Sequence, residues 1–152
     1  MLPYRIGAEV VPSRLPHIAM DSAGGVHAVY AANAADRQGR RPAYYAYCAS
    51  DCSGTGRFTS VALGDGLGDA QIQVTAAGKP RLLLATQRSS TSVIQHEYWS
   101  CDANCLQSTS WTGTVVVEAG TPFFPSNAEN TQSFALDSQG RPRFIFQSND
   151  IG

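Results

Sequence analysis

Three segments of the chain repeat one pattern, and this repeat constrains the fold more than any other feature of the sequence. The segments are HIAMDSAGGVHAVY (17–30), QIQVTAAGKPRLLL (71–84) and SFALDSQGRPRFIF (133–146). In each, alternating apolar residues precede a turn sequence that ends in glycine (Gly24, Gly78 or Gly140), and a second apolar run follows. Alternation on both sides of a short turn predicts a β-hairpin. The chain is therefore expected to consist of tandem units.

A pair of cysteines follows each of the first two hairpins, and it extends the repeat. Each pair has the spacing Cys-x3-Cys and lies between two further runs of β-forming residues. The strands predicted around these pairs are residues 42–48 and 57–63 in the first unit, and 93–101 and 110–117 in the second. Four strands in about 50 residues, repeated in tandem, are typical of a β-propeller blade. A β-sandwich or meander is the alternative, but it would not need the same turn and cysteine spacing twice.

The predicted fold class is therefore all-β, with four-stranded antiparallel propeller blades. In this prediction residues 1–15 hold the last strand of a preceding blade, 16–69 and 70–131 are blades, and 132–152 are the first half of another. About two and three-quarter blades are thus expected, whereas closed propellers have four to eight. Open ends would expose unpaired strand edges. Either the chain is an excerpt of a longer propeller, or copies of it associate.

The four cysteines favour two local disulfides, Cys48–Cys52 and Cys101–Cys105. One zinc site built from all four is the alternative, but neighbouring sheets lie about 10 Å apart, which is too far for ligands of one metal. Paired cysteines favour an extracellular or cell-surface location. The chain shows no signal-peptide pattern at its start and no apolar run long enough to span a membrane, so membrane insertion is not expected.

At the level of these units, the chain resembles the tandem β-propeller repeats of secreted or cell-surface bacterial proteins. The matching stretches are AMDSAGGVHAVY, ALDSQGRPRFIF, YAYCASDC and YWSCDANC, and the resemblance covers nearly the whole chain. It implies surface display or binding and no particular reaction. Sialidase-type propellers carry the pattern S-x-D-x-G-x-T-W. Here Asp21 and Asp137 precede their glycines by three positions and no tryptophan follows, so the sialidase pattern is not matched.

The remaining sequence argues against several functional classes. A net charge of −1, with charged residues at 15%, gives no electrostatic support for nucleic-acid binding. No nucleotide-binding loop or nucleophile motif occurs, and the histidines (His17, His27 and His96) share no metal-ligand spacing. Accordingly no catalytic residue, metal ligand or cofactor is predicted, and a non-enzymatic role is favoured.

Aspartates in turns have two interpretations. Asp65 and Asp69 lie among glycines in GDGLGD and could bind calcium, although an ordinary turn explains the same composition. Asp21 and Asp137, with Thr75 at the same place in the middle copy, are expected to accept hydrogen bonds from their own turn backbone.

The predicted units place variable loops on one side and similar tight turns on the other. The variable loops are residues 31–42, 63–70, 87–92 and 118–131. Variable loops on a rigid scaffold are where binding residues concentrate. The candidate ligand contacts are Arg37, Arg40 and Arg41 in the first loop, and Phe123 and Phe124 in the last. We expect an extracellular binding or display module with a glycan or protein ligand. A sialidase-like or other glycoside-hydrolase propeller, with catalytic residues outside this segment, is the alternative, and a structural spacer is a third.

Overall fold

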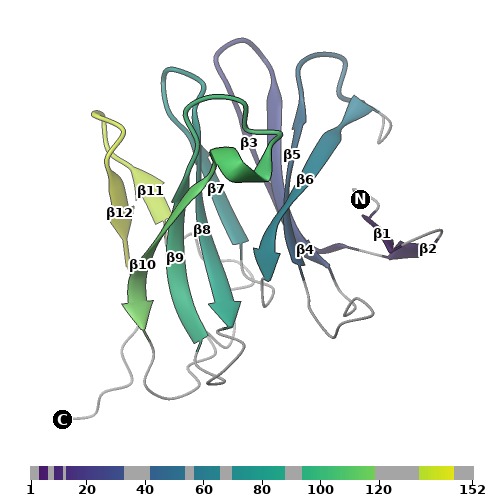
Figure 1. Ribbon diagram of the computed structural model, residues 1–152. Helices are drawn as coiled ribbons and strands as arrows, with labels where there is room; N and C mark the ends of the chain where they lie inside the picture. The colour runs from purple at the N-terminus through teal and green to yellow at the C-terminus, as the bar shows by residue number, and fades with distance from the viewer. Residues whose placement is uncertain are drawn as a thin grey trace.

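The computed structural model describes eight stretches of the chain: residues 4–6, 9–11, 13–32, 42–53, 57–65, 70–87, 94–118 and 134–145. These residues form β-strands, tight turns and one short 3-10 helix, Ser108–Ser110 (Figure 1). The predicted all-β fold class is confirmed, and so are the antiparallel four-stranded sheets.

Two four-stranded antiparallel sheets form the body of the molecule. Sheet 1 has the order β3 (Ser13–Met20), β4 (Val26–Ala32), β5 (Pro42–Cys48), β6 (Thr59–Asp65). Sheet 2 has the order β7 (Ala70–Val74), β8 (Pro80–Gln87), β9 (Ile94–Ser100), β10 (Thr112–Glu118). Two shorter antiparallel pairs flank them: β1 (Tyr4–Ile6) with β2 (Glu9–Val11), and a C-terminal hairpin of β11 (Phe134–Leu136) with β12 (Pro142–Phe144).

Strand boundaries differ from the predicted ones in two places. Residues 4–6 and 9–11 form two short strands where one was expected, and β3 already begins at Ser13. The fourth strands, β6 and β10, each begin two residues later than predicted. In sheet 2 the reason is the 3-10 helix before Trp111, which includes Ser110, the residue that the sequence pattern assigned to the start of the strand.

The structural repeat extends to the pairing of individual residues. The first hairpin of each unit has the same register, with the equivalent cross-strand pairs Ile18–Ala28, Ile72–Leu82 and Phe134–Phe144. Both four-stranded sheets also contain an irregularity at the same place between their third and fourth strands. It falls between the pairs Ala43–Gly64 and Tyr44–Ala62 in sheet 1, and between His96–Val117 and Glu97–Val115 in sheet 2.

The tight turns repeat in the same detail. Gly24, Gly78 and Gly140 have φ values of +87°, +73° and +73°, a region that residues with a Cβ rarely adopt. The turn-forming role predicted for Asp21 and Asp137 is confirmed, because each accepts two backbone N–H bonds through Oδ1. Thr75 uses its Oγ1 for one such bond, from the backbone N–H of Lys79.

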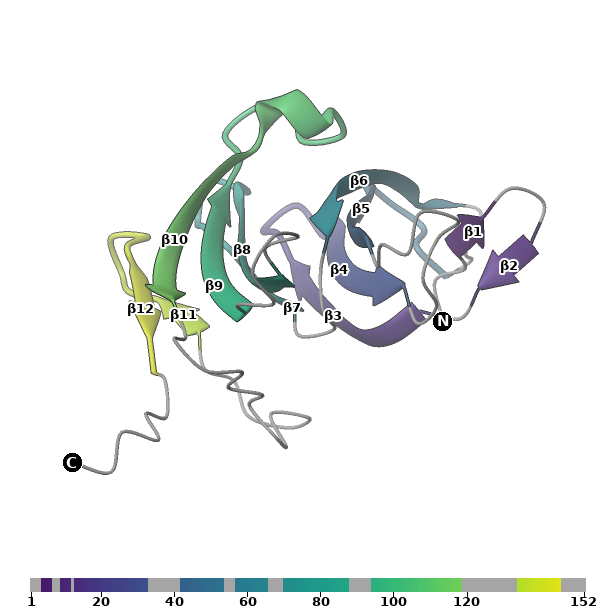
Figure 2. The ribbon, with the colours of Figure 1, turned by 60° about the horizontal axis from the view of Figure 1, so that its bottom comes forward.

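The sheets stack side by side in chain order, as the view in Figure 2 shows. Strand β7 of sheet 2 contacts β3 and β4 of sheet 1, and on its other side it contacts β11. One buried apolar cluster joins the two large sheets. It contains Val29, Ala43, Tyr45 and Leu63 from sheet 1, and Ala70, Ile72, Leu82, Leu84, Cys101 and Trp111 from sheet 2. Each large apolar side chain of this cluster stabilises the folded state by about 1.5–3 kcal/mol because it is removed from water. The contact between the two sheets is therefore a main source of the protein's stability.

Candidate functional site

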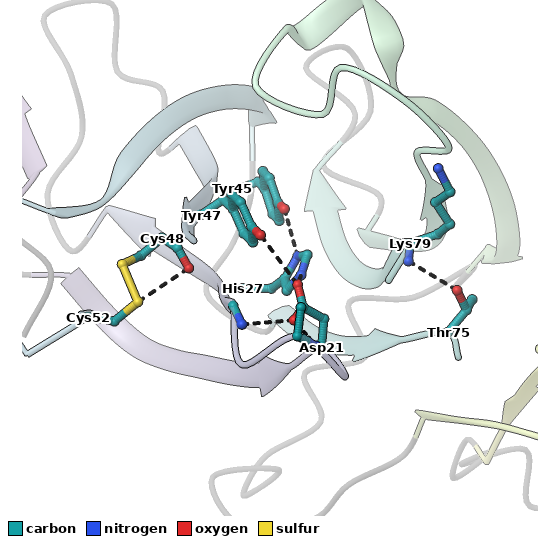
Figure 3. Close-up of polar contacts among 10 residues, drawn as sticks. Asp21, His27, Tyr45, Tyr47, Cys48, Cys52, Thr75 and Lys79 are labelled. Atoms are coloured by element: carbon teal, nitrogen blue, oxygen red, sulfur yellow. Dashed lines mark hydrogen bonds and ion pairs between the residues drawn. A yellow bond between two sulfur atoms is a disulfide. The ribbon is translucent and has the colours of Figure 1, made fainter. Parts of the chain in front are cut away.

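A cluster of four polar side chains lies at the turn end of sheet 1, the upper end in Figure 1 (Figure 3). We call it the His27 cluster: Asp21 from the turn after β3, His27 from β4, and Tyr45 and Tyr47 from β5. His27 stands directly across from Tyr47 in the sheet, which brings their rings to a centroid distance of 4.6 Å. Residues paired directly across two strands lie on the same face of the sheet, and so do residues two positions apart on one strand. The rings of His27, Tyr45 and Tyr47 therefore point to the same side.

Hydrogen bonds fix the protonation pattern of this cluster. His27 Nε2 lies 3.2 Å from Asp21 Oδ2, and His27 Nδ1 lies 2.7 Å from the Tyr45 hydroxyl. The Tyr47 hydroxyl donates to the same Asp21 oxygen at 3.3 Å. An ionised carboxylate can only accept, so Nε2 of His27 carries the proton and Nδ1 accepts from Tyr45.

The electrostatics agree with a neutral histidine beside an ionised aspartate. Burial lowers the pKa of His27 below its ordinary value, although the bond to Asp21 opposes this shift. Hydrogen bonds from the Gly25 backbone and from His27 lower the pKa of Asp21. Burial raises the pKa values of Tyr45 and Tyr47, and the charge of Asp21 adds to both shifts. Both tyrosines therefore remain protonated donors at neutral pH.

An aspartate–histidine pair suggests acid–base chemistry, but the repeat assigns it a structural role. In the third unit the equivalent residues, Asp137 and Arg143, form an ion pair at 2.6 Å, and Arg141 adds a second at 2.7 Å. In the second unit Thr75 replaces the aspartate, and Arg81 instead bonds Asp102 at 2.7 Å and the Cys101 carbonyl at 2.9 Å. All three units thus use this position to anchor a turn.

A second polar group, which the sequence did not predict, lies toward the opposite end of sheet 2. We call it the Glu97 network. Glu97 Oε1 accepts from Thr86 Oγ1 at 2.9 Å and from Gln95 Nε2 at 2.6 Å. Its Oε2 accepts from the indole N–H of Trp99 at 2.8 Å. The Oε1 atom of Gln95 is buried and has no hydrogen-bond partner among the described residues.

The Glu97 network departs from the repeat. The equivalent positions in sheet 1 are apolar or aromatic: Tyr44 stands for Glu97 and Ala46 for Trp99. These residues face sheet 1, because Thr86 and Gln95 are paired across the strands and share the side of Leu82 and Leu84. The signal that could have revealed the network is a charged residue at a position where the first unit of the repeat has the aromatic residue Tyr44.

The residues proposed from sequence as ligand contacts lie outside the described stretches. This applies to Arg37, Arg40 and Arg41, to Phe123 and Phe124, and to Asp69. Asp65 is the last residue of β6, but its side chain is not described. Within the described residues, no group of three or more His, Cys, Asp or Glu side chains is placed to hold a metal ion.

Both predicted disulfides, Cys48–Cys52 and Cys101–Cys105, are present. Each closes the turn between the third and fourth strands at the same end of the sheets as the His27 cluster. The second also positions Trp111, whose indole N–H donates to the Cys105 carbonyl at 2.8 Å. Trp111 then packs edge-on against Tyr45 of the neighbouring sheet, with ring centroids 4.9 Å apart.

Comparison of the chain with protein-family models, curated proteins and solved structures finds no match. The described part of the chain contains no helix with the length and apolar character that crossing a membrane requires.

Proposed function

We propose that this chain supplies consecutive blades of a β-propeller that acts as an extracellular binding or display module. The observation that carries the proposal is the repeated stacking of units: sheet 1 packs on sheet 2, and sheet 2 on the C-terminal hairpin, each through the first strands of the unit. The units have the same hairpin register, and the two four-stranded sheets have the same irregularity between their third and fourth strands. Neighbouring units also contact each other through the same strands. These likenesses support a radial arrangement, in which the first strand of each blade lies nearest the axis.

Binding is favoured over catalysis because of how the polar groups are used. The titratable residues at the turn end are occupied in holding turns, and their equivalents do the same in every unit. The turns themselves are nearly identical, which is typical of a scaffold. The loop end differs between units, since the Glu97 network occurs in sheet 2 where sheet 1 has apolar residues. We place the ligand, a glycan or a protein, at this loop end.

The two disulfides support an extracellular or cell-surface location, because such bonds persist in oxidising compartments. The proposed module would therefore lose a stabilising feature of both four-stranded sheets if it remained inside the cell.

The proposal can be tested by presenting the chain to glycan and protein arrays. Once a ligand is found, Arg40→Ala, Phe124→Ala and Glu97→Gln should weaken its binding about tenfold or more, with little change in melting temperature for the first two. Leu106→Ala, an exposed side chain at the turn end, is the control and should bind normally. A loss of binding with the control, and none with the loop-end variants, would refute the assignment. Turnover of aryl glycosides by the wild-type chain would instead favour the glycoside-hydrolase alternative.

A further inference from the structure

The Glu97 network contains a buried acceptor atom that the described part of the chain leaves unpaired. Gln95 is 6% exposed, and its Nε2 donates to Glu97 Oε1 at 2.6 Å. A reversed amide would place two acceptor oxygens at this distance, so the bond to Glu97 fixes the orientation of the Gln95 amide. The Oε1 atom of Gln95 then has no hydrogen-bond partner among the described residues. Native structures contain few such atoms, and each one calls for a donor.

Glu97 adds a negative charge at the same place. Its half-buried carboxylate accepts from Thr86, Gln95 and Trp99, which are all neutral. None of the ion pairs among the described residues includes Glu97. Its Oε2 atom accepts one hydrogen bond and can accept another. A charge that is partly removed from water is normally paired with a charge of opposite sign, and the described residues supply none here.

Packing holds the carboxylate in position. The Trp99 ring lies directly over Gly113 of β10, where an added Cβ would be 2.7, 2.9 and 3.1 Å from three ring atoms. From there the indole N–H reaches Glu97 Oε2 at 2.8 Å. Leu84 stands directly across from Glu97 and belongs to the central apolar cluster. Glu97 is therefore fixed on the face of sheet 2 that points to sheet 1.

The described residues of sheet 1 bring no donor side chain to this place. At the loop end, the face of sheet 1 that points to sheet 2 carries Ala31, its cross-strand partner Ala43, and Leu63. All three are buried and apolar. The open acceptors of Gln95 and Glu97 therefore lie beside aliphatic side chains, without a described group that neutralises the charge.

Acceptor atoms and a negative charge together define the group that would complement them. Such a group donates N–H bonds and is positively charged, as an ammonium or a guanidinium is. Calcium fits less well, because it takes about six to eight oxygen ligands and Glu97 Oε1 already accepts two hydrogen bonds. A sugar also fits less well, because its hydroxyls accept as well as donate. Among the four side chains of the network, only the second N–H of Gln95 is not directed at Glu97.

We infer that the Glu97 network binds a lysine or arginine side chain of a protein partner, with the N–H groups of that side chain on Gln95 Oε1 and Glu97 Oε2. The aliphatic stem of a lysine or arginine lies well along apolar side chains such as Leu84 while its charged end reaches polar atoms. This inference rests on the proposed function, which places the ligand at the loop end. It narrows that ligand to a protein with an exposed basic residue.

Nuclear magnetic resonance of the whole isotope-labelled chain, titrated with short peptides, tests the inference through the Trp99 indole N–H. The peptides share one sequence and differ at a single position, which is lysine, arginine, citrulline or norleucine. The lysine and arginine peptides should shift this resonance with dissociation constants of about 1–10 mM, as expected for a single small group. Citrulline, which has the shape of arginine without its charge, and norleucine should bind at least about tenfold more weakly. The second tryptophan, Trp111, bonds the Cys105 carbonyl and serves as the internal reference.

Variants of the network locate the binding. Glu97→Gln keeps the shape of the side chain and removes its charge, so it should weaken binding of both basic peptides about tenfold or more. Gln95→Met removes the open oxygen and keeps the carboxylate, and it should also weaken binding. Asp102→Asn is the matched control, because it removes the same charge from a side chain that is 78% exposed at the turn end of sheet 2; it should bind like the wild type. Near-ultraviolet circular dichroism would show that each variant is folded.

Several outcomes would overturn the inference. These are equal binding of the citrulline peptide, equal binding by Glu97→Gln and the wild type, or no shift of the Trp99 resonance at about 50 mM basic peptide. A shift with D-glucosamine and none with the basic peptides would also overturn it, because the positive charge would then belong to a glycan. An array ligand whose binding is lost in Arg40→Ala and retained in Glu97→Gln would refute this inference and leave the proposed function standing.

Discussion

At the scale of single residues, the units differ from one another at pairs of positions whose changes in size compensate. In the first unit Gly25 stands beside Tyr47, whose hydroxyl reaches the Asp21 carboxylate over the bare glycine backbone. In the second unit the equivalent residues are Lys79 and Ser100: the turn residue is large and the strand residue small. The Lys79 ammonium donates to the Asp102 carbonyl. The space beside each turn is thus filled either by the strand residue, as in the first unit, or by the turn residue, as in the second.

A methyl group at Gly25 should therefore destabilise the first unit. Its Cβ would lie 2.5 Å from Asp21 Oδ2 and 2.6 Å from the Tyr47 hydroxyl. We expect Gly25→Ala to lower the free energy of unfolding by about 1–3 kcal/mol, as measured by urea denaturation. Adding Tyr47→Phe, which removes the hydroxyl, should recover part of this loss. Gly64→Ala is the control, because a Cβ there meets nothing within 4 Å; an equal loss in both single variants would contradict the steric explanation.

The buried His27 should make stability depend on pH in the weakly acidic range. Its pKa in the folded protein lies below the ordinary value of 6.5, so the unfolded chain takes up this proton more readily. The stabilising contribution is complete above pH 6.5 and is lost as the pH falls toward the folded-state pKa. The lowered pKa of Asp21 acts in the same direction, but only below its ordinary value of 3.8.

We expect the melting temperature of the wild type to fall between about pH 7.5 and about pH 5.5. His27→Gln should reduce this fall while costing about 1 kcal/mol of stability at neutral pH through the lost hydrogen bonds. His17→Gln is the matched control, since His17 is half-exposed on β3 and outside the cluster. An unchanged pH profile in His27→Gln would show that another group is responsible.

At the scale of the element, the two disulfide turns have the same covalent ring but different consequences. The residue six positions after the second cysteine is Phe58 in sheet 1 and Trp111 in sheet 2. Phe58 packs against a small buried cluster on the face of sheet 1 that points away from sheet 2. Trp111 joins the central cluster and is also tied to its own disulfide turn by the bond to the Cys105 carbonyl. Among the described residues of the two turns, only those of the second connect a disulfide directly to the contact between the two large sheets.

Removing the two disulfides one at a time should reveal this difference. Loss of either five-residue ring should cost about 2 kcal/mol in the loop-entropy model. Cys101→Ala with Cys105→Ala should cost more than Cys48→Ala with Cys52→Ala, because Trp111 also loses its support. In a Trp99→Phe background the emission reports Trp111 alone, since the chain has two tryptophans. We expect a shift to longer wavelength in the first double variant; equal stabilities and unshifted emission would contradict the proposed coupling.

The elements were largely predictable from sequence because their determinants are local. Alternating side chains and a glycine with positive φ specify a hairpin and its register within a few residues, and the Cys-x3-Cys spacing favours a disulfide within each pair. The strand starts at Thr59 and Thr112 were missed because nothing in the pattern distinguishes the end of the disulfide turn from the first strand residue. The Glu97 network was missed for another reason: Thr86 and Glu97 meet only through strand pairing, and a lone glutamate in a strand does not reveal its partners.

At the scale of the whole molecule, sheet 2 packs against its two neighbours through its two opposite faces. Leu82 and Leu83 are neighbours in β8 and both are buried, but their side chains point to different neighbours. Leu82 belongs to the cluster shared with sheet 1. Leu83 is paired across from Tyr98, the residue that contacts the C-terminal hairpin. Adjacent leucines of equal size thus stabilise two different contacts, which makes them a matched pair of probes.

Amide hydrogen exchange should separate these two contacts. Leu82→Ala and Leu83→Ala each remove a buried side chain, at a cost of about 2–5 kcal/mol. If the sheets stack as described, Leu82→Ala should increase exchange in β4 and β5 of sheet 1 more than in β11 and β12, and Leu83→Ala should do the reverse. Both variants lose the same number of atoms from the same strand, so a general loss of stability would raise exchange in the same regions in both. An identical exchange pattern would mean that unfolding is fully cooperative or that the stacking order is wrong. A reciprocal pattern would show that each contact between neighbouring sheets is stabilised by its own pair of faces.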